Sequence, residues 1–227
     1  MLRRKRSKEE EEEVVEAFTA HFCDAIQNKL GRIKNAASLF VDSDIIPKKA
    51  KQDKLEEMLT TSGINELKLL YRGTKDGMSV KAFHDKCDGW KGPTLTLVRT
   101  SKDYVFGGYA GTSRDSPRWG HHVTDPSCFV FNVVNPWNDP ITKMPVLKPE
   151  YAMWCSAAYG PYFPGAFGIC NRNWDPEGLL DCGYSYFDVS NPYGDPLGRR
   201  EQTFVDDPRG DFTPVEIEVF AVAVPLC

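Results

Sequence analysis

Short apolar runs separated by turn residues dominate the chain after residue 66 and restrict what it can fold into. Runs of this kind, rich in β-branched and aromatic residues and bounded by Gly, Pro, Asn and Asp, predict β-strands. Strands this numerous and so unevenly joined favour two packed antiparallel sheets. We therefore predict an α+β fold, a β-sandwich flanked by short helices. The expected strands are 67–72, 94–100, 104–110, 128–134, 165–170, 184–189 and 215–224.

The first part of the chain has a helical texture instead. Apolar residues recur at spacings of three and four between Val15 and Ile33, which predicts an amphipathic helix with one buried stripe. A second helix is expected over 48–61, so residues 14–63 form an N-terminal helical extension. Within the β-rich part we expect one short helix, with Ser79 as N-cap and a stop near Gly89.

Residues 1–13 carry opposite charges in two blocks, RRKR and then a run of five glutamates. Such a segment has no apolar face, so we expect a solvated or partner-bound tail; a nuclear-import or docking signal is the alternative. The blocks also leave no room for the apolar core of a signal peptide. Together with the absence of an apolar run of roughly 18 residues, this predicts a cytoplasmic protein without a transmembrane segment, at most peripheral to a membrane or the cytoskeleton.

The net charge and the cysteine content restrict the possible classes of function further. The 28 basic and 32 acidic side chains give a net charge of −4, which provides no general attraction to nucleic acid. The seven cysteines contain no CxxC pair, and we expect reduced thiols.

The stretch YVFGGYAG (104–111) places three glycines in and after an expected strand. A dinucleotide-binding loop would need a helix to open after the last glycine, but the turn sequence TSRDSP follows. We therefore expect no cofactor. Gly107 and Gly108 are expected to admit a close partner or a bulge, and Gly111 to end the strand.

A metal site and a catalytic thiol can both be considered from the residue types present, but the spacing of these residues does not support either. His84 and Cys87 lie three residues apart on the expected short helix, and His121 and His122 are adjacent. Adjacent histidines rarely bind one ion, so we expect no metal. A thiol-dependent enzyme using Cys87 beside His84, or Cys170, remains an alternative.

Glu216 and Glu218 alternate with apolar residues in the last expected strand, so both carboxylates point to the same face. A general acid/base pair is one interpretation. A solvent-facing or Arg-paired sheet edge is the more ordinary one.

The order of these segments resembles a known family. Residues 69–111, LLYRGTKDGMSVKAFHDKCDGWKGPTLTLVRTSKDYVFGGYAG, are similar to the first half of a TLDc domain. CFVFNV, AFGIC, CGYSYF and VEIEVFAV match later strands of that domain in the same order. The resemblance covers about 64–224 and defines a TLDc-like β-sandwich domain at 64–227, while the segment 135–162 is longer than the usual connection.

The resemblance implies a sandwich of two antiparallel sheets, in which Gly107 and Gly108 permit close sheet packing. It also implies a non-enzymatic module that docks on proteins, with links to the proton-pumping vacuolar ATPase and to oxidative-stress resistance. A structural subunit of a cytoskeletal or ciliary assembly is the alternative within the interaction class. The residues expected to bind a partner are Arg114, Arg118, Trp119, Trp137, Arg172, Trp174, Glu216 and Glu218.

Overall fold

The computed structural model describes residues 38–46, 49–115, 117–170, 177–185, 192–194 and 204–223. Leu39 to Cys227 belong to one compact unit. Several predictions from the sequence lie outside the described residues: the tail 1–13, the helix between Val15 and Ile33, and the binding residues Arg172 and Trp174.

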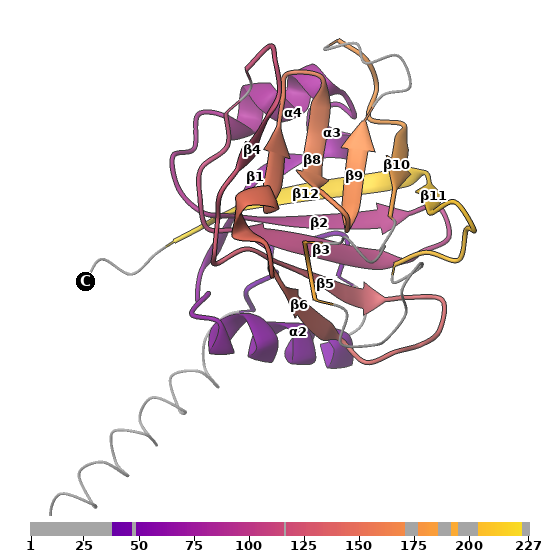
Figure 1. Ribbon diagram of the computed structural model, residues 1–227. Coiled ribbons are helices and arrows are strands. Elements are labelled where there is room, and N and C mark those ends of the chain that lie inside the picture. Colours follow the sequence, from indigo (N-terminus) through magenta and orange to yellow (C-terminus); the bar gives the residue numbers. More distant parts are fainter. Residues whose placement is uncertain are drawn as a thin grey trace, which may run out of the picture. The chain divides into compact units, whose positions relative to one another are not determined.

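Strands make up most of the described part of the chain, with a few short helices (Figure 1). The helices are α2 (Lys49–Thr61), α3 (Gly73–Asp76), α4 (Val80–Cys87) and the 3₁₀-helix η1 (Pro149–Tyr151). The strands are β1 (Leu67–Arg72), β2 (Thr94–Thr100), β3 (Val105–Ala110), β4 (His121–Val123), β5 (Phe129–Val134), β6 (Thr142–Pro145), β7 (Met153–Cys155), β8 (Tyr159–Phe163), β9 (Phe167–Cys170), β10 (Cys182–Tyr184), β11 (Asp211–Phe212) and β12 (Pro214–Val222).

The strands form two main sheets and a small ribbon. The larger sheet has the order β1-β12-β2-β3-β5-β6, the smaller one the order β11-β10-β9-β8, and β4 pairs with β7. Every pairing among the described strands is antiparallel. The predicted fold class is therefore confirmed, and the closing strand β12 lies inside the larger sheet, between β1 and β2.

One core lies between the two sheets and is rich in aromatic rings. Phe106 of the larger sheet contacts Phe167 of the smaller sheet, with 5.2 Å between ring centroids, and Phe163 lies 4.9 Å from Phe167. The helix α4 adds Phe83, whose ring packs 5.8 Å from Tyr71 of β1. Burial of each such side chain contributes about 1.5–3 kcal/mol, so this layer is the main source of stability.

A second core covers the opposite face of the larger sheet. The helix α2 runs alongside the larger sheet (Figure 1). Its Leu55 and Leu59 pack on that face, and Phe40 meets Phe220 of β12 edge-on at 6.1 Å. A sheet that is apolar on both faces needs a cover on both. The compact unit that starts at Leu39 therefore includes α2, the later part of the expected helical extension.

The glycine pair in β3 has the packing role that the sequence suggested. A Cβ atom at Gly108 would lie 2.5 Å from the ring of Phe163, in the core between the sheets. A Cβ at Gly107 would press against the Thr96 carbonyl and, at 2.6 Å, the ring of Phe131 on the other face. Both faces of β3 are thus approached more closely than a side chain allows.

The predicted helices and long strands agree with the structure. The expected helix 48–61 is α2, and Ser79 caps α4 by accepting the Ala82 N–H, while α3 is a short helical turn that was not expected. The expected strand 184–189 is described only as β10, which starts at Cys182. The strands that sequence reading missed are β4, β6, β7, β8 and β11. Four of these five fall between residues 135 and 215, where glycines and prolines such as those of YGPYF in β8 are typical of turns.

Candidate functional site

Glu216 and Glu218 lie on one face of β12, as the alternation predicts, but neither faces solvent. Their exposed fractions are 2% and 0%. The solvent-facing alternative was wrong because β12 is an interior strand, flanked by β1 and β2. The Arg-paired alternative is confirmed for Glu218, which pairs with Arg72.

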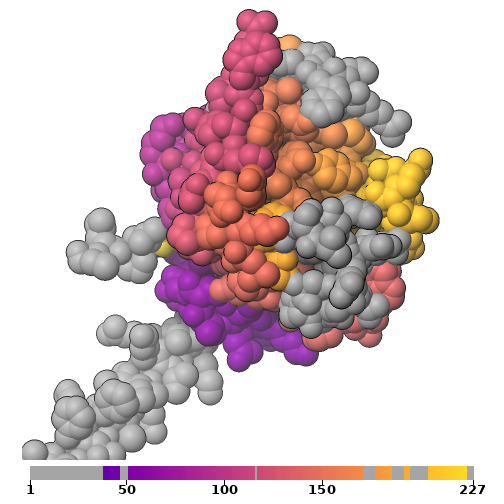
Figure 2. All heavy atoms as spheres, in the orientation of Figure 1, coloured from indigo at the N-terminus to yellow at the C-terminus, as the bar shows by residue number. Residues whose placement is uncertain are grey.

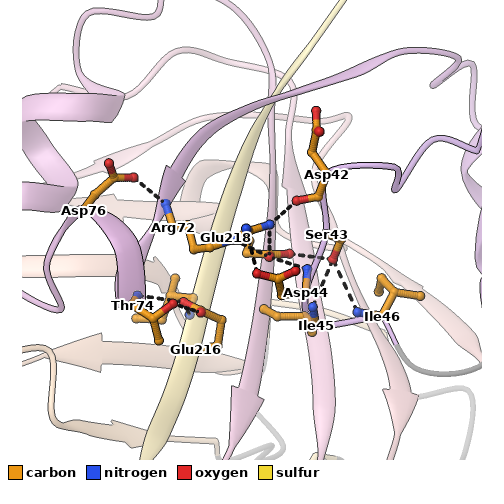
Figure 3. Close-up of polar contacts among 11 residues, drawn as sticks. Asp42, Ser43, Asp44, Ile45, Ile46, Arg72, Thr74, Asp76, Glu216 and Glu218 are labelled. Carbon is orange, nitrogen blue, oxygen red and sulfur yellow. Dashed lines mark hydrogen bonds and ion pairs between the residues drawn. The ribbon is translucent and has the colours of Figure 1, made fainter.

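The Glu218 carboxylate is the centre of a buried polar network (Figure 3). Its Oε1 accepts hydrogen bonds from Arg72 Nε at 3.0 Å and from the Asp44 N–H at 2.8 Å, and Arg72 Nη2 lies 2.9 Å away. Its Oε2 accepts the Ser43 hydroxyl at 2.6 Å. The same guanidinium also pairs with Asp44 Oδ2 at 2.7 Å and bonds to the Asp42 carbonyl. Glu218 therefore fastens the segment Asp42–Asp44 to the larger sheet.

Glu216 fastens a different segment. Its Oε1 accepts the Thr74 N–H at 3.1 Å, and its Oε2 accepts the Thr74 hydroxyl, so the carboxylate holds the start of α3 (Figure 3). Asp76 at the end of α3 accepts the Arg72 N–H at 2.9 Å. We name Ser43, Asp44, Arg72, Thr74, Glu216 and Glu218 the closing-strand cluster.

The electrostatics of the closing-strand cluster fit a structural role. Burial raises the pKa of Glu218, although the hydrogen bonds from Ser43 and Asp44 and the charge of Arg72 act in the opposite direction. Its carboxylate oxygens already accept bonds from this domain's own side chains and main chain. A carboxylate with occupied acceptors and no exposed surface is a poor contact for a partner.

The loop between β3 and β4, described at 111–115 and 117–120, has a rigid base. Asp125, with an exposed fraction of 1%, accepts the N–H groups of Gly111 at 2.6 Å and Thr112 at 3.1 Å. It also accepts the N–H and the hydroxyl of Ser127, at 2.9 and 2.6 Å. This carboxylate ties the start of the loop to the segment that leads into β5.

Arg114 belongs to the buried base and not to the exposed surface that we expected. Its exposed fraction is 4%, and its guanidinium stacks on the ring of Phe163, 5.4 Å from the centroid. The side chain turns inward because the loop folds back over the core between the sheets. At the end of the loop, Gly120 packs directly against the indole of Trp154, where a Cβ atom would not fit.

Arg118 and Trp119 lie at the outer end of the same loop, and we name them the β3–β4 tip. Trp119 has an exposed fraction of 81%, the largest among the exposed large apolar side chains of the described chain, and the Arg118 guanidinium lies 5.6 Å from its ring. In Figure 2 this loop projects beyond its surroundings at the top of the view. The structure thus presents an aromatic ring and a cation together on a fixed base.

Trp137, another predicted binding residue that the structure describes, does not join the tip. Trp137 is half-buried in the turn between β5 and β6, where its N–H donates to Asn135 Oδ1 at 3.0 Å. Asp125 and Arg72, which hold the two regions, were missed. A signal for Asp125 exists in the sequence TDPS, since Asp followed by Pro and Ser is typical of a turn closed by the aspartate side chain.

The thiol candidate Cys87 is buried, and the histidine candidates His121 and His122 contact other side chains. Burial raises the pKa of Cys87 to about 12, whereas an activated nucleophile needs a lowered pKa. His121 pairs with Asp115 at 3.5 Å, and the His122 ring packs on Trp154. Among the residues that the structure describes, no three His, Cys, Asp or Glu side chains are grouped so as to hold a metal ion.

Comparison with known protein families agrees with the family resemblance found in the sequence. The TLDc domain family matches residues 40–223, a range that includes α2 and starts one residue after the compact unit does. No curated protein matches the chain in a sequence search. In the described part of the chain, every helix is too short or too polar to cross a membrane. The chain belongs to the TLDc domain family.

Proposed function

We propose that this TLDc chain is a non-enzymatic protein-interaction module that docks on a large cytoplasmic complex through its β3–β4 tip. The observation that carries the proposal is the pairing of an exposed Trp119 with a buried base. Trp and Arg are the residue types most enriched at the energetic centres of protein interfaces. An exposed indole has no stabilising role in this domain alone, so a partner accounts for it.

The rigid base makes the tip an efficient binding element. Asp125 fixes the entry of the loop, and Arg114 and Gly120 anchor it further along by packing on Phe163 and Trp154. Ordering a flexible loop on binding would cost free energy, and a loop already held in place avoids most of that cost.

For the partner we propose the vacuolar proton-pumping ATPase, with a role in oxidative-stress resistance, on the strength of family membership. A cytoskeletal or ciliary assembly is the second candidate, and in that case the chain is a structural subunit. The same tip serves both proposals, because each requires only a specific protein contact.

The non-enzymatic part of the proposal rests on the state of the thiols that sequence reading considered. Cys87 is buried and its pKa is raised to about 12, so it is protonated at neutral pH. Labelling with a thiol reagent at mildly acidic pH tests this point. A cysteine that reacts rapidly under those conditions would support the enzyme alternative.

Affinity purification tests the docking surface. Tagged wild-type protein, Trp119→Ala and Arg118→Ala are purified from cells in parallel, and the recovered proteins are identified by mass spectrometry. Val41→Ala is the matched control, since Val41 is also a highly exposed apolar residue but lies in another segment. We expect Trp119→Ala to lose a defined set of partners that Val41→Ala retains.

The identity of that set separates the two partner proposals. Pump subunits that depend on Trp119 support the regulator, and cytoskeletal or axonemal proteins support the structural subunit. Equal recovery of all partners by wild type and Trp119→Ala would reject the β3–β4 tip as the docking surface.

A further inference from the structure

Two cysteines face each other across β9 and β10 in the smaller sheet. Cys170 and Cys182 are direct partners in the antiparallel register, and their Sγ atoms lie 3.2 Å apart. We name them the β9–β10 dithiol. Direct partners in an antiparallel pair have Cα atoms about 4.5–5.5 Å apart, within the range of about 4.4–6.8 Å that a disulfide spans. The backbone therefore already holds the two thiols at bonding geometry.

The β9–β10 dithiol is reachable from outside. Both side chains are partly exposed, and both line a cavity of about 620 Å³, a size typical of small-molecule sites. The cavity wall also includes Thr100 and Tyr104 from the larger sheet and the segment that leads into β11. The other described cysteines, Cys87, Cys128 and Cys155, are buried.

The charges around the cavity favour a small uncharged reagent. Among the described residues of its lining are three carboxylates, Asp206, Asp207 and Asp211, and two cations, Lys102 and Arg209. Lys102 is paired with Asp206 at 2.6 Å and Arg209 with Asp211 at 3.1 Å, so both described cations already have a carboxylate partner. An anionic disulfide such as oxidised glutathione is disfavoured here, whereas hydrogen peroxide is not.

We propose that the β9–β10 dithiol is a modification site at which hydrogen peroxide converts Cys170 and Cys182 into a disulfide. In the first step one sulfur attacks peroxide, the O–O bond breaks, and a sulfenic acid and hydroxide form. In the second step the other thiol attacks that sulfur, the S–O bond breaks, and the disulfide and water form. In total, two thiols and one peroxide give one disulfide and two waters, with sulfur oxidised by two electrons and peroxide reduced by two.

The environment of Cys170 assigns the order of the steps. Burial, followed by the hydrogen bond and charge of Cys182, raises the pKa of Cys170 to about 12. Cys170 therefore keeps its proton at neutral pH, and we assign the first attack to Cys182. Once Cys182 is a sulfenic acid, its sulfur lies directly opposite Cys170 in the strand pair, and the Cys170 sulfur attacks it.

The disulfide joins two strands that are otherwise held by few residues. β10 has three residues and pairs with β11, which has two, so the bridge fixes the part of the sheet that forms the cavity wall. Closing the loop between residues 170 and 182 reduces the freedom of the unfolded chain. Oxidation is therefore expected to raise the melting temperature and to slow hydrogen exchange in β10.

Peptide mapping of the full-length protein tests the proposal. Reduced, desalted wild type, Cys170→Ser, Cys182→Ser and the control Cys155→Ala are treated with hydrogen peroxide at neutral and at alkaline pH. Each sample is then alkylated and digested without reduction for mass spectrometry. We expect wild type and Cys155→Ala to lose the mass of two hydrogens and to give one linked peptide pair that contains Cys170 and Cys182. The disulfide should form faster at alkaline pH than at neutral pH.

The single variants make the test decisive even if one of them is less stable. Cys170→Ser should stop at a sulfenic acid on Cys182, which dimedone traps, and Cys182→Ser should leave Cys170 largely unreacted. The proposal would be overturned if the disulfides joined other cysteines. It would also be overturned if wild type consumed all the peroxide and gave no linked peptide pair. Trapping on Cys170 in the Cys182→Ser variant at the wild-type rate would also overturn it, since the assigned order would then be wrong.

Discussion

The closing-strand cluster and the β3–β4 tip both contain residues that the sequence predicts to bind a partner, but the two regions differ in solvent exposure. Glu218 is fully buried and is bonded to Arg72, Ser43 and Asp44. Trp119 is almost fully exposed beside Arg118. The charged residues are inside and the large apolar residue is outside, the reverse of what composition alone suggests.

This difference shows that the strand order decides which polar residues remain exposed and can bind a partner. β12 lies between β1 and β2 and is covered by the segment 38–46, so its carboxylates must find partners within the domain. At the outer end of the β3–β4 loop, by contrast, Trp119 is exposed among the residues that the structure describes. Even within that loop, Arg114 turns inward to Phe163 while Arg118, four residues later, is exposed.

The largest effect should come from breaking the closing-strand cluster. Arg72→Met leaves the carboxylate of Glu218 buried without its charge partner, and we expect the free energy of unfolding to fall by about 3 kcal/mol. Urea denaturation measures it. The control is Lys81→Met, which removes an exposed ion pair with Asp85 and should leave the free energy of unfolding nearly unchanged. Equal losses in the two variants would show that the cluster contributes no more than a surface pair.

A smaller loss is expected from the base of the tip. Asp125→Ala removes the acceptor for the N–H groups of Gly111 and Thr112, and unpaired buried donors cost about 1–3 kcal/mol. Partner recovery should fall as well, because the tip is no longer held. Asp115→Ala, an exposed carboxylate in the same loop, is the matched control. If Asp125→Ala keeps full partner recovery, the rigidity of the base is not needed for docking.

The pH dependence of stability should single out Glu218. Its pKa is raised in the folded state, so its contribution to the free energy of unfolding is fully present below its ordinary pKa of 4.5 and is lost as pH rises through the raised value. Glu218→Gln cannot titrate there. We therefore expect the stability of wild type relative to Glu218→Gln to decline from acid toward neutral pH, measured by denaturation at a series of pH values. A difference that grows with pH would mean that the pairing with Arg72 outweighs burial.

The smallest effect on stability should come from the tip itself. Trp119→Ala removes an exposed ring, so the free energy of unfolding should change by less than about 0.5 kcal/mol. The same variant should lose partner recovery. Thermal denaturation beside the affinity purification separates the two properties. A marked loss of stability would show that the indole packs on the domain and would weaken the docking proposal.

Most of the fold could be predicted because the pattern that specifies it is local. Strands such as β2 and β5 are rich in β-branched and aromatic residues, and Ser79 is a clear N-cap for α4. The short strands between residues 135 and 163 could not be predicted. Pro and Gly in β6 and β8 suggest loops, and only pairing with neighbours such as β5 and β9 makes these segments extended.

The candidate site was also predictable only in part, because residue type is local information and burial is not. Residue type singled out Arg118 and Trp119 as binding residues, but it could not separate them from Arg114 or Trp137, because burial depends on how the loop folds. Asp125 and Arg72 hold the two regions through contacts with residues that the sequence does not place beside them.

By itself, the sequence determined the alternation of strands, the close packing at Gly107 and Gly108, and the family resemblance. These features depend on neighbouring residues and on the order of segments, which the chain carries directly. Only the tertiary structure decided that residues 39–63 cover the larger sheet, that Glu216 and Glu218 are buried, and that Cys170 meets Cys182. Each of these depends on which strands become neighbours, and that choice is made by burial of apolar surface over the whole domain.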